Sequence, residues 1–67
     1  MKAGMIGFNG TGIERLVCNV FPSGAAIEIK GTLCIPESFN LMIDSEQIDK
    51  TCRVVWRKYQ RIGVAFI

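Results

Sequence analysis

The amino-acid sequence predicts a small all-β domain of six short antiparallel strands. Apolar and polar residues alternate with a period of two in several segments, most clearly at Cys52, Val54 and Trp56, as expected for strands with one buried face. Turn-forming residues recur about every 8–12 residues, and no segment has the periodicity of an amphipathic helix. With 67 residues, the chain has room for one domain. Residues 1–67 are therefore expected to form a single small barrel or sandwich, and a closed barrel would expose no strand edge.

The first two strands are expected to form a hairpin. Residues 3–8 form the first strand and precede Asn9-Gly10, a dipeptide that favours hairpin turns because both residues tolerate positive φ. Thr11-Gly12 is expected to lengthen this loop, so that the second strand covers residues 13–20. In that strand, the alternation places three side chains on the inward face: Leu16, Cys18 and Val20.

Turn-forming residues also bound the third and fourth strands. Residues 21–24, Phe-Pro-Ser-Gly, predict a turn because proline presets its own φ and glycine adopts angles that other residues avoid. The third strand then covers residues 25–29 and the fourth covers residues 39–43. Between them, residues 33–36 are apolar, and Pro36 places them at an edge or a barrel corner because it has no N–H to donate. The side chains expected on the inward faces are Ala25, Ile27, Ile29, Phe39, Leu41 and Ile43.

The last sixteen residues predict a second hairpin. The inward face of Cys52, Val54 and Trp56 alternates with polar positions at Arg53 and Arg57. A polar stretch at 58–61 follows as the loop, and the apolar run at 62–66 forms the sixth strand. Residues 44–50, the most polar stretch, are expected to be an exposed loop or a single helical turn.

Charge is distributed unevenly along the chain. Residues 1–49 carry three basic and six acidic side chains, a balance of −3, whereas residues 50–67 carry five basic and no acidic side chains, a balance of +5. Such asymmetry can mark an anion-binding edge. The favoured interpretation is that strands from the acidic part lie beside the basic hairpin and pair with it across the sheet.

The cysteine and histidine content argues against a metal site. Cys18, Cys34 and Cys52 include no Cys-x-x-Cys pair, and the chain has no histidine, so zinc or haem coordination is not expected. Cys18 and Cys52 are expected to be small buried hydrophobes. Because free thiols fit a reducing compartment, and neither a signal peptide nor an apolar run of ~18 residues is expected, we expect a cytoplasmic protein without a cofactor or membrane insertion.

Catalysis is not expected either. The chain has no histidine to act as a base near pH 7, and its carboxylates are scattered over outward faces and loops. The serines Ser23, Ser38 and Ser45 lie in turn-like segments, where their usual role is to bond nearby backbone groups. The sequence therefore favours a binding role over an enzymatic one.

Three segments resemble the PilZ domain family. Residues 19–25, Asn-Val-Phe-Pro-Ser-Gly-Ala, are similar to the family's Asp/Asn-x-Ser-x-x-Gly turn. The resemblance continues in Ile-Pro-Glu-Ser-Phe-Asn-Leu at 35–41. It is strongest in Cys-Arg-Val-Val-Trp-Arg at 52–57, followed by Arg-Ile-Gly-Val-Ala-Phe at 61–66. Together these segments run from the second expected strand to the end of the sequence.

This resemblance implies a six-stranded antiparallel barrel with a part in bacterial cyclic di-GMP signalling. Members of the family typically bind this dinucleotide and pass the signal to a partner protein or an attached domain. The ligand is held by an Arg-x-x-x-Arg pair ahead of the first strand, whose guanidinium groups meet phosphates and stack on guanine. The turn supplies polar groups that read a base edge, and the matching residues here are Asn19, Ser23 and Gly24.

The sequence departs from the family pattern at both elements. Residues 1–4 contain no arginine, and Phe21 replaces the serine of the turn. Lys2 and Arg15 are the basic residues expected to make weak phosphate contacts instead, although a lysine has no planar fork. Because each charge-assisted hydrogen bond is worth about 1.5–3 kcal/mol, a dinucleotide normally bound near micromolar would bind at millimolar concentration or not at all.

The leading hypothesis is therefore a non-enzymatic adaptor of cyclic di-GMP signalling. Its binding of cyclic di-GMP would be weakened or lost, and contact with a protein partner would be its main role. A second hypothesis is a barrel that binds single-stranded nucleic acid through a basic face of the C-terminal hairpin formed by Arg53, Arg57 and Arg61. It is less favoured because Tyr59 is the only aromatic side chain expected to point clearly outward, and stacking platforms usually use more than one ring.

A third hypothesis is a homo-oligomer. Three apolar residues are expected on outward faces, where they would form a contact patch: Val17, Met42 and Val55.

Overall fold

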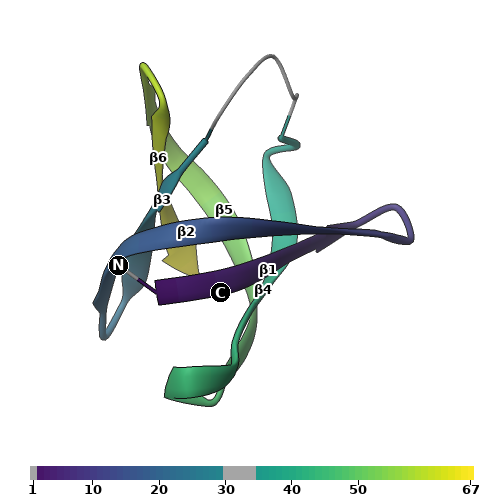
Figure 1. Ribbon diagram of the computed structural model, residues 1–67. Coiled ribbons are helices and arrows are strands. Elements are labelled where there is room, and N and C mark those ends of the chain that lie inside the picture. Colours follow the sequence, from purple (N-terminus) through teal and green to yellow (C-terminus); the bar gives the residue numbers. More distant parts are fainter. Residues whose placement is uncertain (1, 30–34) are drawn as a thin grey trace.

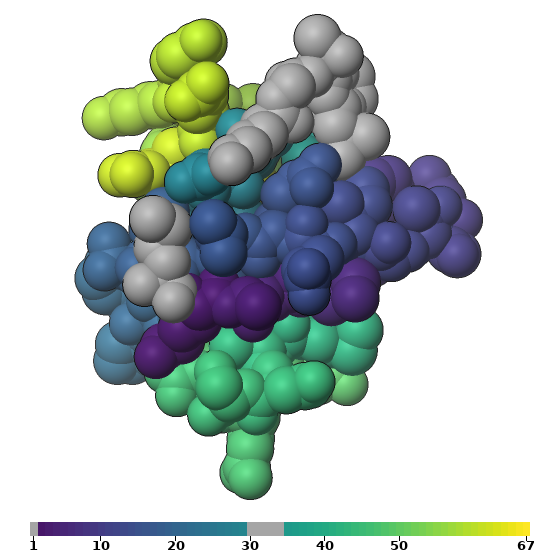
Figure 2. All heavy atoms as spheres, in the orientation of Figure 1, coloured from purple at the N-terminus to yellow at the C-terminus, as the bar shows by residue number. Residues whose placement is uncertain are grey.

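Within residues 2–29 and 35–67, which the computed structural model describes, six antiparallel strands close into a barrel in the order β1-β2-β3-β6-β5-β4 (Figure 1). This result confirms the predicted all-β fold and the six-stranded antiparallel barrel. Figure 2 shows one face of the molecule, on which β1 lies between β2 and β4. The elements are β1 (Lys2–Phe8), β2 (Thr11–Phe21), β3 (Gly24–Glu28), β4 (Ser38–Ile43), the 3₁₀ turn η1 (Asp44–Glu46), β5 (Ile48–Lys58) and β6 (Arg61–Phe66).

The interior of the barrel is apolar. No polar or charged residue of the described chain is buried, and every strand contributes to one hydrophobic cluster. The predicted inward positions of β3 and β4 are confirmed, with Ile29 only partly buried against the core. Burial of this surface is the main favourable term for a chain of this size. The core residues are Ile6, Val17, Ala25, Ile27, Ile35, Phe39, Leu41, Ile43, Cys52, Val54, Ile62 and Val64.

The β1–β2 hairpin has a tighter turn than the sequence analysis predicted. Asn9 and Gly10 have φ angles of 49° and 74°, and Phe8 pairs directly with Thr11. Two central residues with positive φ match the twist of the flanking strands. The expectation that Thr11-Gly12 lengthens the loop was therefore wrong, because both residues already belong to β2.

A β-bulge in β2 changes which side chains face the core. The pairing of β2 with β3 shifts between Val17 and Asn19, which leaves Cys18 as the extra residue. Val17 is 1% exposed, whereas Leu16 is exposed and Cys18 is half-buried. The predicted inward face of β2 was wrong for Leu16, and the expected burial of Cys18 is only partial because Cys18 is the extra residue of the bulge. Val17 cannot contribute to an outward patch, because an inserted residue reverses the alternation on one side of the bulge.

The polar segment after β4 is short. Residues 44–46 form η1, and Gln47 ends it with a φ of 54° while its N–H donates to the Asp44 carbonyl at 3.1 Å. A single helical turn was one of the predicted forms, but β5 begins at Ile48, earlier than expected. Of the predicted corner at 33–36, residues 33 and 34 lie outside the described residues, and Ile35 is buried against the core.

Gly24 is expected to tolerate no side chain. A Cβ atom there would overlap the backbone carbonyl of Val64 on β6, whereas a Cβ at Gly7 would meet nothing closer than 3.9 Å. We expect Gly24→Ala to lower the free energy of unfolding by about 1–3 kcal/mol, as overpacking does. Gly7→Ala, the matched control, should leave it unchanged or raise it by a few tenths of a kcal/mol. Urea denaturation of both variants tests this, and equal stabilities would contradict the close β3–β6 approach.

Candidate functional site

The outer face of β3 and β6 carries small residues. The registers place Gly24 opposite Ala65 and Ala26 opposite Gly63, so these four residues form neighbouring cross-strand pairs. Strand β2 borders this floor on one side and β5 on the other. Because side chains alternate between the two faces of each strand, the small residues leave a depression on the outside of the barrel.

A second β-bulge directs Trp56 toward this depression. The pairing of β5 with β6 shifts between Val54, which faces Val64, and Trp56, which faces Gly63. Val55 and Trp56 therefore both point outward, with 53% and 40% of their surfaces exposed. The prediction that Trp56 shares the inward face of Cys52 and Val54 was wrong, because it assumed an uninterrupted alternation.

The Trp56 ring lies directly against Gly63. A Cβ atom built on Gly63 would overlap three atoms of the indole, so only a residue without a side chain permits this contact. A glycine inside a strand often marks such a close approach. The indole covers the glycine, which is buried, and the ring forms one wall of the depression.

Phe21 forms the opposite wall. It pairs with Gly24 at the turn between β2 and β3, and 53% of its surface is exposed. We call the resulting depression the outer groove; its volume is about 190 Å³. Among the described residues, no charged side chain lines it, and its lining residues are Phe21, Ser23, Gly24, Ala25, Ala26, Val55, Trp56, Gly63, Val64 and Ala65.

The residues of the family-like turn gather at this groove. Ser23 and Gly24 line it, and Asn19 lies opposite Ala26 in the β2–β3 register. The Ser23 carbonyl accepts a hydrogen bond from the Phe66 N–H at 2.9 Å, which ties the turn to β6. The structure thus brings together the three residues that the sequence analysis singled out in the turn.

Lys2 and Arg15 lie away from the outer groove. Neither lines the outer groove. The Lys2 ammonium is 3.5 Å from a carboxylate oxygen of Glu46. Arg15 donates from Nη1 to the Glu14 carbonyl at 2.9 Å. The two basic residues expected to contact phosphates are therefore not brought together with Asn19, Ser23 and Gly24.

Arg57 of the C-terminal hairpin is held by residues outside the hairpin, whereas Arg53 and Lys58 lie beside the outer groove. Arg57 is held by residues 35–37, since its Nη2 donates to the Ile35 carbonyl at 2.7 Å and lies 3.4 Å from a Glu37 carboxylate oxygen. This ion pair is of the kind predicted between the acidic part and the basic hairpin. Arg53 pairs with Ala65 at the β5 edge of the groove floor, and the Lys58 ammonium lies 5.6 Å from the centre of the Trp56 ring. The predicted single face of Arg53, Arg57 and Arg61 is thus interrupted at Arg57.

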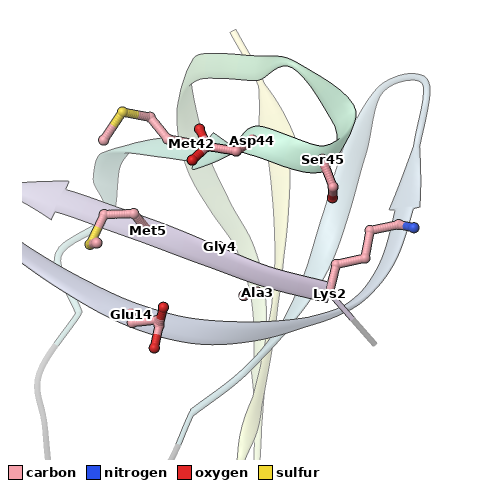
Figure 3. Close-up of a pocket in the computed structure, with 8 residues that line it drawn as sticks. All are labelled: Lys2, Ala3, Gly4, Met5, Glu14, Met42, Asp44 and Ser45. Carbon is pink, nitrogen blue, oxygen red and sulfur yellow. The ribbon is translucent and has the colours of Figure 1, made fainter.

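A larger hollow of about 640 Å³ lies over β1 (Figure 3). Figure 3 shows Glu14 and Asp44 on opposite sides of β1, with Met5 and Met42 at one end of the hollow. Two carboxylates make this hollow unfavourable for an anion such as a phosphate. It contains none of the turn residues, and we therefore take the outer groove as the candidate site. The hollow is lined by Lys2, Ala3, Gly4, Met5, Glu14, Met42, Asp44 and Ser45.

The described residues offer no metal site, since no three histidine, cysteine, aspartate or glutamate side chains among them come close enough to hold a metal ion. Residues 2–29 and 35–67 also contain no helix that could span a membrane.

Comparison with known proteins gives no assignment: no protein-family model matches the chain, and no curated protein or solved structure matches it.

Substitution of Gly63 should displace the indole. We expect Gly63→Ala to lift the Trp56 ring away from the sheet, because the new methyl group would occupy its position. The fluorescence of Trp56, the only tryptophan in the chain, should then shift to longer wavelength and become easier to quench with acrylamide. Gly12→Ala is the control, since its Cβ would meet only the flexible end of Met5, at 3.3 Å. Unchanged emission from the Gly63 variant would show that the ring does not lie on this glycine.

Cys52 should make the stability depend on alkaline pH. Desolvation by burial raises the pKa of the Cys52 thiol from 9.0 to about 11, against smaller lowering effects of the Leu41 backbone and the Lys50 charge. Above pH 9 the unfolded chain loses this proton while the folded chain keeps it, so stability should fall as pH rises from about 9 to about 11. Urea midpoints across this range should fall more steeply for the natural chain than for Cys52→Ala. If the urea midpoints of the two proteins fall in parallel with pH, the buried thiol does not contribute to the pH dependence of stability.

Proposed function

We propose that this chain is a non-enzymatic, PilZ-like adaptor in bacterial cyclic di-GMP signalling, whose dinucleotide binding is weak or lost. Contact with a protein partner is its main role. One observation carries the proposal: Phe21 occupies the position of the turn's serine and forms an exposed wall of the outer groove. A polar position of a ligand-binding turn has thus become part of an apolar surface. Such a module would work in the cytoplasm, where its thiols stay reduced.

The dimensions and chemistry of the groove argue against tight binding of a dinucleotide. Its volume of about 190 Å³ is smaller than the roughly 300–1,000 Å³ of most small-molecule sites. Its lining, as far as the described residues go, contains no charged residue, whereas a cyclic dinucleotide carries two phosphates that need cationic donors. Arg15 and Lys2 lie outside the groove, so neither supplies a cation to it.

The same features favour a protein partner. Tryptophan and arginine are among the residues that contribute most binding energy at protein interfaces, and phenylalanine is enriched there. Phe21, Val55 and Trp56 gather such exposed apolar surface on one face. The chain has no histidine, and residues 2–29 and 35–67 show no pairing of a nucleophile with a base that would support catalysis instead.

Single-stranded nucleic acid is the second candidate ligand. The observation in its favour is that Phe21 and Trp56 point outward as well as Tyr59, which is 90% exposed. Exposed rings beside cations can stack bases and neutralise phosphates. We rank this candidate second because Arg57, the middle cation of the proposed basic face, is already held by Ile35 and Glu37.

Titration with cyclic di-GMP, followed by chemical-shift mapping, tests the proposal. We expect no saturable change around Asn19, Ser23 and Gly24 below about 1 mM, the affinity left after several charge-assisted bonds are lost. Phe21→Ser, which restores the hydroxyl of the family-like turn, should improve binding by about tenfold at most, because one neutral hydrogen bond is worth about 0.5–1.5 kcal/mol.

The matched control is Val55→Ser. Val55 is as exposed as Phe21 and lines the same groove, but it is not part of the turn, so this variant should gain no affinity. Saturation of the natural chain at micromolar cyclic di-GMP would refute the weak-binding part of the proposal while leaving the fold intact.

A further inference from the structure

We infer that the outer groove binds an extended, acidic segment of another protein, with apolar side chains of that segment seated between Phe21 and Trp56. This inference rests on the proposed function, because it names the chemical class of the partner for the same site. It follows from the shape of the groove, the charges at its rim and the spacing of those charges along β5.

The floor of the groove is apolar and sterically open. Gly24, Ala26, Gly63 and Ala65 present almost no side chain, so an incoming side chain can approach the sheet closely. Phe21 and Trp56 stand at its two sides, and Val55 lies beside Trp56. Rigid aromatic walls around a small-residue floor suit an aromatic or aliphatic anchor, whose burial supplies most of the affinity at such sites.

The charges at the rim of the groove determine which charge the partner segment should carry. Arg53 lies at the β5 edge of the floor, and among the described residues no carboxylate pairs with it. Lys58 lies over the Trp56 ring at 5.6 Å and likewise has no carboxylate partner in that part of the chain. Arg61 is less available, because Glu28 lies opposite it on β3. Since the described lining residues carry no charge, Arg53 and Lys58 make the rim positive, which favours an acidic partner.

The spacing of these cations defines the partner further. Arg53 and Lys58 lie opposite Ala65 and Arg61 of β6, which are four positions apart, or about 13 Å at the rise of a strand. An extended peptide covers that distance in about four residues. A segment with acidic residues four apart and apolar residues between them would therefore present both carboxylates on one face, one at each cation, with its apolar side chains over the groove.

A second copy of this chain fits less well. The hollow over β1 combines Met5 and Met42 with Glu14 and Asp44, so it offers an apolar surface with the complementary charge. Contact between that hollow and the outer groove would join two different surfaces, and repetition of such a contact produces open filaments unless the rotation closes a ring. Lys2 at the same hollow also opposes docking onto a positive rim.

The experiment uses the full chain and a synthetic peptide with phenylalanine and leucine between glutamates spaced four residues apart. Trp56 fluorescence and chemical shifts report binding. We expect saturable binding, with changes concentrated at Phe21, Val55 and Trp56. A peptide with lysines in place of the glutamates, and one with serines in place of the apolar residues, should each bind at least tenfold more weakly.

Charge reversal on the protein completes the test. Arg53→Glu combined with Lys58→Glu should lower the affinity for the acidic peptide by tenfold or more. Lys50→Glu reverses one charge on the same strand, at a position opposite Leu41 of β4 and not opposite the groove floor, and it should leave the affinity within about twofold. Circular dichroism and urea midpoints establish that each variant remains folded, so that a loss of binding is not a loss of the barrel.

Several results would overturn the inference. The first is binding of the lysine peptide as tight as that of the acidic peptide. The second is the absence of saturable binding of the acidic peptide. The third is an unchanged affinity of the double variant for the acidic peptide. Tighter binding of a thymidine oligonucleotide at the same residues would assign the groove to nucleic acid. Concentration-dependent self-association, measured by sedimentation, that makes the groove inaccessible to the peptide would assign it to a second copy. Micromolar cyclic di-GMP binding would instead refute the weak-binding part of the proposed function, whereas failure of the peptide alone refutes only the class of partner.

Discussion

The absence of side chains at Gly24 and Gly63 is the constraint on which both the closure of the barrel and its candidate site depend. Gly24 lets the turn after β2 pack against the Val64 carbonyl of β6, and Gly63 lets the Trp56 ring lie on the sheet. Both glycines belong to the β3–β6 pairing, the seam that joins the N-terminal strands to the C-terminal hairpin. The groove on the outside of the barrel is therefore a direct consequence of how the barrel is closed.

The two β-bulges determine which apolar residues stabilise the fold and which remain on its surface. In β2, the extra residue Cys18 turns Val17 into the core and leaves Leu16 outside. In β5, the extra residue Val55 leaves Cys52 and Val54 buried while Trp56 points outward. A bulge costs regular hydrogen bonds but redirects a side chain, and bulges recur beside functional sites for that reason. In this chain, the bulge of β5 converts a core-like tryptophan into surface available for binding.

Much of the fold follows from the sequence, because the alternation in residues 39–43 and the Asn9-Gly10 turn each have one dominant physical interpretation. The bulges were missed, since no particular residue type marks an inserted residue in a sequence. A bulge is recognised only when the pairing with the partner strand is known. The turn residues of the site were found by resemblance, but the outward position of Trp56 was not. One signal was available: Gly63 and Ala65 alternate as small residues in β6, as Gly24 and Ala26 do in β3, and a glycine inside a strand indicates a close approach.

The central claim is that the Trp56 indole lies on the outer face of the barrel, against Gly63, and so forms a wall of the outer groove. A nuclear Overhauser spectrum of the free chain tests this most directly. The account predicts strong contacts between the indole protons and the Gly63 α-protons, with those α-protons shifted upfield by the ring current. Contacts from the indole to core methyl groups such as those of Ile27 and Leu41, without contacts to Gly63, would contradict it.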